Sequence, residues 1–135
     1  DYREMLENEP EIDALIISTP DHMHTPIAAS AMDLGKHLYI EKPLCHTVVE
    51  ARFLARRARE TNIVSQMGNQ GHAEEGGRLI NEWVADGVLG AVQEVHCWTN
   101  RPVWPQGIGR PAGSDPIPST LGWDLWVGAA PFVLI

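Results

Sequence analysis

Three short apolar runs alternate with segments of helical periodicity, and this alternation limits the folds open to the chain. The runs cover residues 14–18, 37–40 and 63–67. Apolar runs of this length are typical of strands that a parallel sheet buries on both faces. Around them, apolar residues recur at helical spacing in four segments: residues 2–8, 25–34, 47–60 and 74–85. The alternation predicts a parallel α/β sheet with right-handed crossovers, which is half of a doubly wound fold.

The ends of the predicted helices carry capping residues. Thr47 and Glu50 form the sequence pattern of a capping box at the start of the longest helix. Thr25 is expected to cap the helix before it, and Gly35 suits the position just after that helix ends. These signals place the turns between helices and strands.

Polar loops follow all three predicted strands, over residues 19–24, 41–46 and 68–72. Parallel strands end on the same side of a sheet, so the three loops must meet at one edge. Open α/β sheets bind their ligands in the crevice at that edge. The sequence therefore gathers a set of chemically useful side chains there: Thr19, His24, Glu41, Lys42, Asn69 and Gln70.

The central strand ends abruptly in Glu41-Lys42-Pro43. Lys42 is one of only two lysines in the chain, and the other is Lys36. Proline keeps the residue before it out of the helical conformation and stops a strand, so Pro43 constrains where the amine points. The alternative interpretation is an exposed Glu–Lys pair at a strand end, which would contribute little to stability.

The character of the chain changes after Gly90. Residues 91–99 predict a longer strand of a different sheet, and residues 101–122 predict a long loop because they hold many prolines and glycines. Residues 123–128 fit either a helical turn or a short strand.

The net charge of −8 argues against partners that require a basic face. We therefore expect neither a nucleic acid nor an anionic membrane surface as a partner. No apolar run approaches the ~20 residues of a membrane-spanning helix. Cys45 and Cys97 are too few for a disulfide framework, and reduced thiols fit a cytoplasmic location. The chain begins with Asp1 inside a predicted helix, so the lack of a signal peptide is uninformative.

Two motifs give the chain a resemblance to a known family. Residues 18–24 read Ser-Thr-Pro-Asp-His-Met-His, which matches a Thr-Pro-Asn-x-x-His signature with Asp21 in place of asparagine. Glu41-Lys42-Pro43 matches the Glu-Lys-Pro motif of the same family, and the spacing between the two motifs also fits. Over residues 1 to about 100 the chain resembles the glucose-fructose oxidoreductase, inositol dehydrogenase and rhizopine-catabolism (Gfo/Idh/MocA) family.

The resemblance implies a domain organisation. Residues 1–90 would be the second half of a Rossmann-type parallel sheet, a partial dinucleotide-binding domain without its N-terminal half. Residues 91–135 would begin a truncated α+β C-terminal domain for substrate binding or oligomerisation. The Gly-x-Gly-x-x-Gly turn that seats the pyrophosphate is absent, and the second-domain helix that brings further catalytic side chains in this family would lie beyond the last residue. We expect an internal fragment of a longer protein that, by itself, binds NAD weakly or not at all.

The resemblance also implies a function. The full-length protein would be an NAD- or NADP-dependent oxidoreductase, a homo-oligomer, that transfers hydride to or from a sugar or polyol-like substrate. Lys42 would be catalytic and would assist proton transfer at the reacting oxygen, and the Lys42–Pro43 peptide bond would be cis. The expected cofactor-binding residues are Thr19, Pro20, His24, Glu41, Lys42, Asn69 and Gln70, with His24 supporting its loop.

Oxidation of an alcohol needs a base for the hydroxyl proton. A lysine serves as that base near neutral pH when burial or a nearby cation lowers its pKa, and an adjacent carboxylate would act in the opposite direction. Neighbouring residues of a strand face opposite sides. We therefore expect the carboxylate of Glu41 to point away from the amine of Lys42.

Other functions fit the same residues. An NAD-dependent glycosidase of this superfamily, which breaks a glycosidic bond through transient oxidation, is one. A non-catalytic family member that only binds or regulates is another. His22, His24, His46 and His72 lie on neighbouring loops, but no carboxylate or cysteine completes a convincing ligand set, so we expect no metal site.

Overall fold

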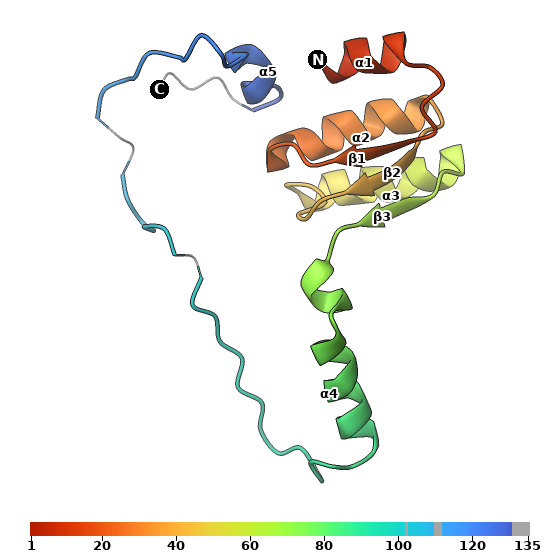
Figure 1. Ribbon diagram of the computed structural model, residues 1–135, viewed down its shortest axis with the longest axis vertical. Coiled ribbons are helices and arrows are strands. Elements are labelled where there is room, and N and C mark those ends of the chain that lie inside the picture. Colours follow the sequence, from red (N-terminus) through yellow and green to blue (C-terminus); the bar gives the residue numbers. More distant parts are fainter. Residues whose placement is uncertain (102, 110–111, 131–135) are drawn as a thin grey trace. The chain divides into compact units, whose positions relative to one another are not determined.

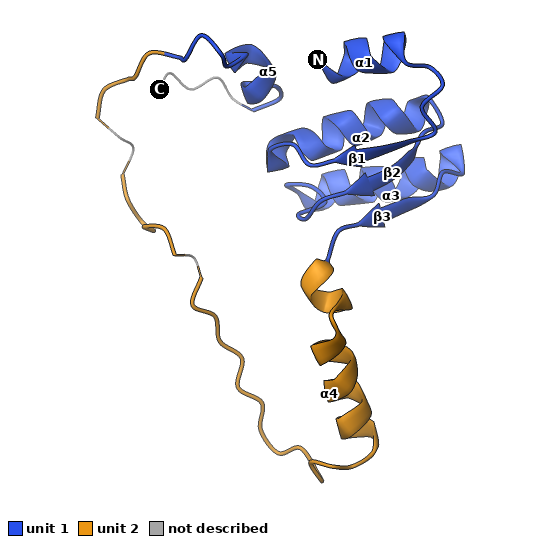
Figure 2. Cartoon of the chain, viewed as in Figure 1, with its two compact units in different colours: residues 1–69, 117–134 blue, residues 70–116, 135 orange. Residues whose placement is uncertain are grey.

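The computed structural model describes residues 1–101, 103–109 and 112–130. They form two compact units, shown in two colours in Figure 2. The first, here called the sheet unit, comprises residues 1–69 and the described part of residues 117–134. The second unit comprises residues 70–116. The predicted domain boundary at residue 90 stays a prediction.

The sheet unit contains three parallel strands in the order β1-β2-β3 (Figure 1). They are β1 (Ala14–Ile17), β2 (His37–Ile40) and β3 (Ser65–Met67). Helix α2 (His24–Asp33) connects β1 to β2, and α3 (Val48–Thr61) connects β2 to β3. The prediction of a parallel α/β sheet with helical crossovers is confirmed.

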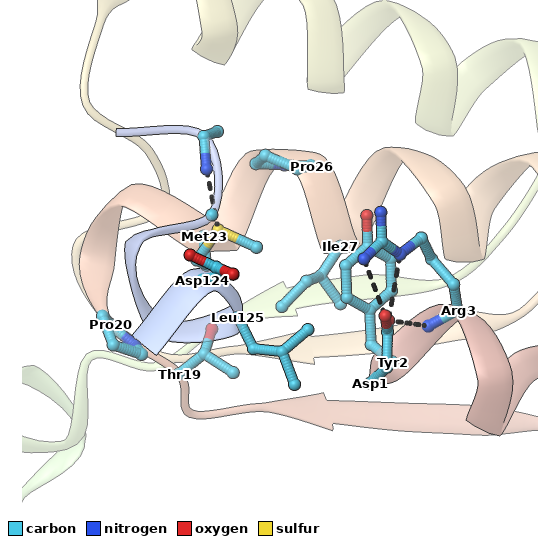
Figure 3. A pocket seen from close by; sticks show the side chains of 12 residues that line it. Asp1, Tyr2, Arg3, Thr19, Pro20, Met23, Pro26, Ile27, Asp124 and Leu125 are labelled. Carbon is cyan, nitrogen blue, oxygen red and sulfur yellow. Dashed lines mark hydrogen bonds and ion pairs between the residues drawn. The ribbon is translucent and has the colours of Figure 1, made fainter. Parts of the chain in front are cut away.

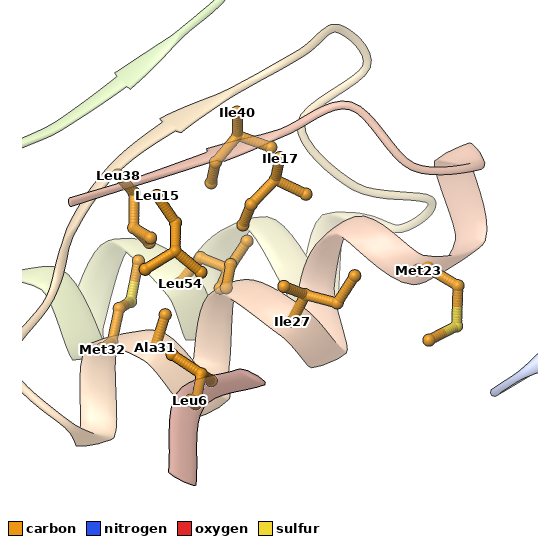
Figure 4. Close-up of a cluster of buried hydrophobic side chains, with 11 residues drawn as sticks. Leu6, Leu15, Ile17, Met23, Ile27, Ala31, Met32, Leu38, Ile40 and Leu54 are labelled. Carbon is orange, nitrogen blue, oxygen red and sulfur yellow. The ribbon is translucent and has the colours of Figure 1, made fainter. Parts of the chain in front are cut away.

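The core lies between the sheet and its helices. Alternate strand residues, Leu15 and Ile17 of β1 and Leu38 and Ile40 of β2, are buried against α2 and α3, as Figure 4 shows. Helix α1 (Tyr2–Asn8) adds Leu6, which is also buried. A side chain that leaves water in this way stabilises the fold by roughly 1.5–3 kcal/mol before entropy is counted.

The expectation that the strands bury both faces was wrong for the described residues. β1 alternates strictly between exposed and buried side chains, and Ile16 on its outer face is 78% exposed. The reason is that α2 and α3 lie on the same face of the sheet (Figure 1). Only Leu15 and Ile17 of β1 are therefore buried, although the whole strand is apolar.

Two of the three predicted helix ends are confirmed. Thr47 accepts a hydrogen bond from the backbone of Glu50, whose carboxylate accepts one from the backbone of Thr47, which completes the capping box. Gly35 follows the end of α2 with a φ of +71°, a left-handed conformation that glycine adopts without strain. Thr25 does not cap α2. A short helical turn, η1 (Asp21–Met23), precedes α2, which begins at His24 with Met23 at the capping position.

The second unit begins with η2 (Gln70–Ala73) and α4 (Glu75–Ala85). The strand predicted over residues 91–99 does not form. A β-strand needs a neighbouring strand to pair its backbone groups, and the described residues of this unit supply none. Residues 123–128 turn out helical, as α5 (Trp123–Val127), which belongs to the sheet unit. No helix in the described ranges has the length and apolar character needed to cross a membrane.

Candidate active site

The carboxyl ends of the three strands form one edge of the sheet. The backbone N–H of Glu41 donates to the carbonyl of Ile17 over 2.9 Å, and that of Gly68 donates to the carbonyl of Ile40 over 2.7 Å. These bonds carry the pairing of the strands into the loops that follow. The exposed side chains of Thr19, Lys42 and Asn69 therefore start from neighbouring strand ends, as the sequence predicts. Gln70, the remaining predicted site residue, is the first residue of the second unit and of η2.

His24 joins the first two of these loops. It is the first residue of α2 and is only 1% exposed. Its Nε2 lies 2.9 Å from the carbonyl oxygen of Thr19, and its Nδ1 lies 2.7 Å from that of Pro43. The loop after β1 and the loop after β2 are thus linked through one buried ring.

Lys42 lies at the start of the second loop. The Lys42–Pro43 peptide bond is cis, as the family resemblance implies. The Lys42 side chain is exposed, and among the described residues its ammonium makes no ion pair or hydrogen bond. The Glu41 carboxylate instead accepts a hydrogen bond of 3.3 Å from the backbone N–H of Lys42.

A segment far along the chain packs against the first loop. The Nε2 of His22 lies 2.8 Å from the carbonyl oxygen of Trp126, and the backbone N–H of Ala129 donates to the Sδ of Met23 over 3.4 Å. Gly128, with a φ of +51°, lies so close to Met23 that a Cβ there would collide with the Met23 sulfur. Sequence reasoning missed this contact. Its only signal was a glycine directly after a tryptophan-rich turn.

A cavity of about 420 Å³ lies between the loop after β1, the first turn of α2, the start of the chain and the α5 segment (Figure 3). Thr19 and Pro20 line one side of it, and Asp124 and Leu125 of α5 line another. Its apolar part comes from Tyr2, Met23, Pro26 and Ile27, and Asp1 and Arg3 form an ion pair of 2.7 Å at its rim. Lys42 does not line this cavity. We therefore expect the proton transfer by Lys42 to take place at the edge of the sheet and not in this cavity.

The residues present fit one end of a dinucleotide. An unpaired ammonium and an exposed threonine at the ends of adjacent parallel strands suit the polar part of a nicotinamide nucleoside. The turns after β1 and β2, residues 18–23 and 41–47, contain no glycine, so they offer no close backbone cradle for phosphates. Within the described ranges, no three His, Cys, Asp or Glu side chains are arranged to hold a metal ion.

Known proteins share this part of the fold. The model of the Gfo/Idh/MocA family, described as an oxidoreductase family with an NAD-binding Rossmann fold, matches residues 1–69. Levoglucosan dehydrogenase of Pseudarthrobacter phenanthrenivorans is 29% identical over 92 residues, which cover 68% of this chain and 23% of that protein. Glycosyl hydrolase family 109 protein 1 of Shewanella sp. (strain ANA-3) is 40% identical over 92 residues, which cover 66% of this chain and 19% of that protein.

A solved structure adds a ligand-bound comparison. An inositol dehydrogenase homologue from Azotobacter vinelandii, in complex with NADH and myo-inositol, superposes with a TM-score of 0.56 at 37% identity. The match covers 67% of this chain and 25% of that structure. The chain thus spans between 19% and 25% of the length of these three relatives. With half of its residues matched to the family model, the chain belongs to the Gfo/Idh/MocA family of NAD(P)-dependent oxidoreductases.

Proposed function

We propose that the full-length protein transfers hydride between NAD or NADP and a sugar or polyol-like substrate, and that this chain supplies the nicotinamide end of the site. One observation carries the proposal: an unpaired lysine ammonium starts from the end of β2, beside the loop that carries Thr19. Two relatives support the substrate class, since one is a levoglucosan dehydrogenase and another was solved with myo-inositol. Assembly as a homo-oligomer is part of the same proposal.

Lys42 is the catalytic residue in this proposal. When an alcohol becomes a carbonyl, the carbon loses a hydride and the oxygen loses a proton. The bound cofactor supplies the hydride acceptor. The amine of Lys42 takes the hydroxyl proton and becomes an ammonium, and in the reverse direction the ammonium returns it. In this proposal Thr19, Pro20, Glu41 and Asn69 border the cofactor and fix its ring relative to the lysine. The cofactor contact expected of Gln70 stays a prediction.

A second candidate is an NAD-dependent glycosidase. The 40% identity to a family 109 glycosyl hydrolase favours it. In that reaction the substrate is oxidised and reduced again within one turnover, so reduced cofactor does not accumulate. The same lysine would serve, because the oxidation step again needs a base for a hydroxyl proton.

The test uses the full-length protein with a panel of sugars, polyols and aryl glycosides. A dehydrogenase accumulates NADH or NADPH, seen by absorbance, whereas a glycosidase releases the aryl group without net reduction. Lys42→Ala should lower kcat by about 10²–10⁴-fold, the usual contribution of a general base. Lys36→Ala is the matched control, because Lys36 donates to the Pro10 carbonyl over 2.6 Å and precedes β2. Undiminished turnover in Lys42→Ala would refute the proposed role.

A further inference from the structure

The cavity beside Thr19 has a wall that the proton transfer at the sheet edge does not use. This wall is α5, and all residues that line the cavity belong to the sheet unit. The indole rings of Trp123 and Trp126 stack on each other on one side of α5, with centroids 5.3 Å apart. Asp124 and Leu125 lie on the other side of the helix and line the cavity (Figure 3). The helix therefore presents a carboxylate to this space.

The charges around the cavity leave that carboxylate unmatched. Asp1 and Arg3 at the rim neutralise each other through their ion pair of 2.7 Å. The carboxylate of Asp124 has no hydrogen-bond or ion-pair partner within the described ranges. The hydroxyl of Thr19, on another side of the cavity, also has no partner there. A molecule in the cavity thus meets one negative charge and one hydroxyl that are both available for hydrogen bonds.

These groups select among chemical classes of ligand. A carboxylate accepts hydrogen bonds from hydroxyl groups and repels phosphates and other carboxylates, so the phosphates of a dinucleotide are disfavoured in this cavity. An ammonium would have to lose its water against the apolar lining, which costs more than the burial of a hydroxyl. Small-molecule sites of about 300–1,000 Å³ typically combine an apolar wall with a few placed polar groups. The cavity fits a neutral ligand with several hydroxyls, whose C–H groups pack on the apolar lining.

We propose that the cavity is a subsite for the non-reacting end of a neutral polyhydroxylated substrate. Asp124 determines specificity there by accepting a hydrogen bond from one substrate hydroxyl. The inference rests on the proposed function, which places the reacting end of the substrate beside Lys42. Thr19 borders both the cavity and the sheet edge, so a substrate at the edge extends past Thr19 into the cavity. Because Lys42 does not line the cavity, Asp124 acts on substrate binding and not on proton transfer.

The first measurement needs no turnover. Saturation-transfer difference NMR of the full-length protein is recorded with D-glucose, D-galactose, D-glucitol, D-gluconate and D-glucosamine. We expect transfer to at least one of the three neutral compounds, less to D-gluconate than to D-glucitol, and loss of the transfer in Asp124→Ala. Asp13→Ala should keep it, because Asp13 is exposed, precedes β1 and does not line the cavity.

Three results of this measurement would overturn the inference. One is the absence of transfer to every neutral compound, and another is transfer that Asp124→Ala retains. The third is stronger transfer to D-glucosamine than to D-glucose, because the preferred ligand would then be an ammonium.

The second measurement is steady-state kinetics of the full-length protein with the sugar or polyol that it turns over fastest. Asp124→Ala should raise the KM of this substrate by about 10- to 100-fold, the contribution of a hydrogen bond to a charged group. We expect kcat to change less than about threefold and the cofactor KM to stay the same, the pattern of lost ground-state binding. One monodeoxy analogue, which lacks the hydroxyl that Asp124 binds, should have the same KM with the parent protein and with Asp124→Ala.

The two proposals fail in different ways. An unchanged substrate KM in Asp124→Ala would refute the subsite, while Lys42→Ala reports separately on the proposed function. If no compound is turned over, the proposed function fails, and the NMR measurement still decides whether the cavity binds a polyhydroxylated compound.

Discussion

The two helices α3 and α4 show how differently the two units use similar sequence patterns. Both are amphipathic, but Leu54 of α3 is 2% exposed, whereas Ile80 and Trp83 of α4 are 56% and 49% exposed. Helix α3 has the sheet to pack against, and α4 has no buried residue. Most helical stability in proteins comes from packing of the apolar face and not from propensity. The stability of the 135-residue chain should therefore reside in the sheet unit.

The largest expected effect is a core truncation. Ile17→Ala removes a side chain that is 2% exposed at the centre of the sheet, so we expect it to lower the free energy of unfolding by about 2–5 kcal/mol. The same truncation in the second unit, Ile80→Ala, should change it by less than about 0.5 kcal/mol. Urea unfolding of the 135-residue chain, followed by circular dichroism, measures both. Equal losses of unfolding free energy in Ile17→Ala and Ile80→Ala would contradict the claim that the sheet unit carries the stability.

A smaller effect is expected where the distant segment meets the sheet unit. Gly128→Ala places a methyl group against Met23 at a positive φ, and such backbone strain costs about 1–3 kcal/mol. Trp123 and Trp126, whose rings stack at 5.3 Å, report on the segment through their fluorescence, which should shift to the red. Gly113→Ala shares the positive φ, but no atom lies within 4 Å of the new methyl. It should leave the emission unchanged, and a matching shift would show that the Met23 contact is irrelevant.

The smallest effect concerns helix capping. Thr47→Ala removes the side-chain acceptor that begins α3 and should cost about 1 kcal/mol in the urea experiment. The residue before α4, Glu74, makes no side-chain capping bond. Glu74→Ala should therefore be nearly neutral, and a comparable loss in both variants would mean that the two helix starts are equally important.

Features that depend on local chemistry were predictable from the sequence. The three strands, the Thr47 capping box and the Gly35 helix end follow from residue patterns that span a few positions. The meeting of Thr19 and Lys42 at one edge follows from the parallel order alone. Longer-range features were not predictable. The strand expected over residues 91–99 lacks a partner, and the exposure of Ile16 depends on which face the helices cover.

The candidate site also combines features that local sequence predicts with contacts between residues far apart in the chain. The sequence placed Lys42 at a strand end because an apolar run that stops in Glu41-Lys42-Pro43 is a local signal. It could not show that both ring nitrogens of His24 face carbonyl oxygens, since those oxygens lie five and nineteen residues away. It also did not predict the contact between His22 and Trp126, which are 104 residues apart. Backbone acceptors carry no sequence signature, so such links appear only in three dimensions.

The most direct test of Lys42 as the base is chemical rescue. Lys42→Ala of the full-length protein is assayed with and without a small primary amine such as ethylamine, with Lys36→Ala in parallel. The account predicts that the amine restores part of the lost rate in Lys42→Ala, in proportion to its unprotonated fraction, and has no effect on Lys36→Ala. A Lys42→Ala enzyme that turns over normally, or that stays inactive at every amine concentration while still binding cofactor, would contradict it.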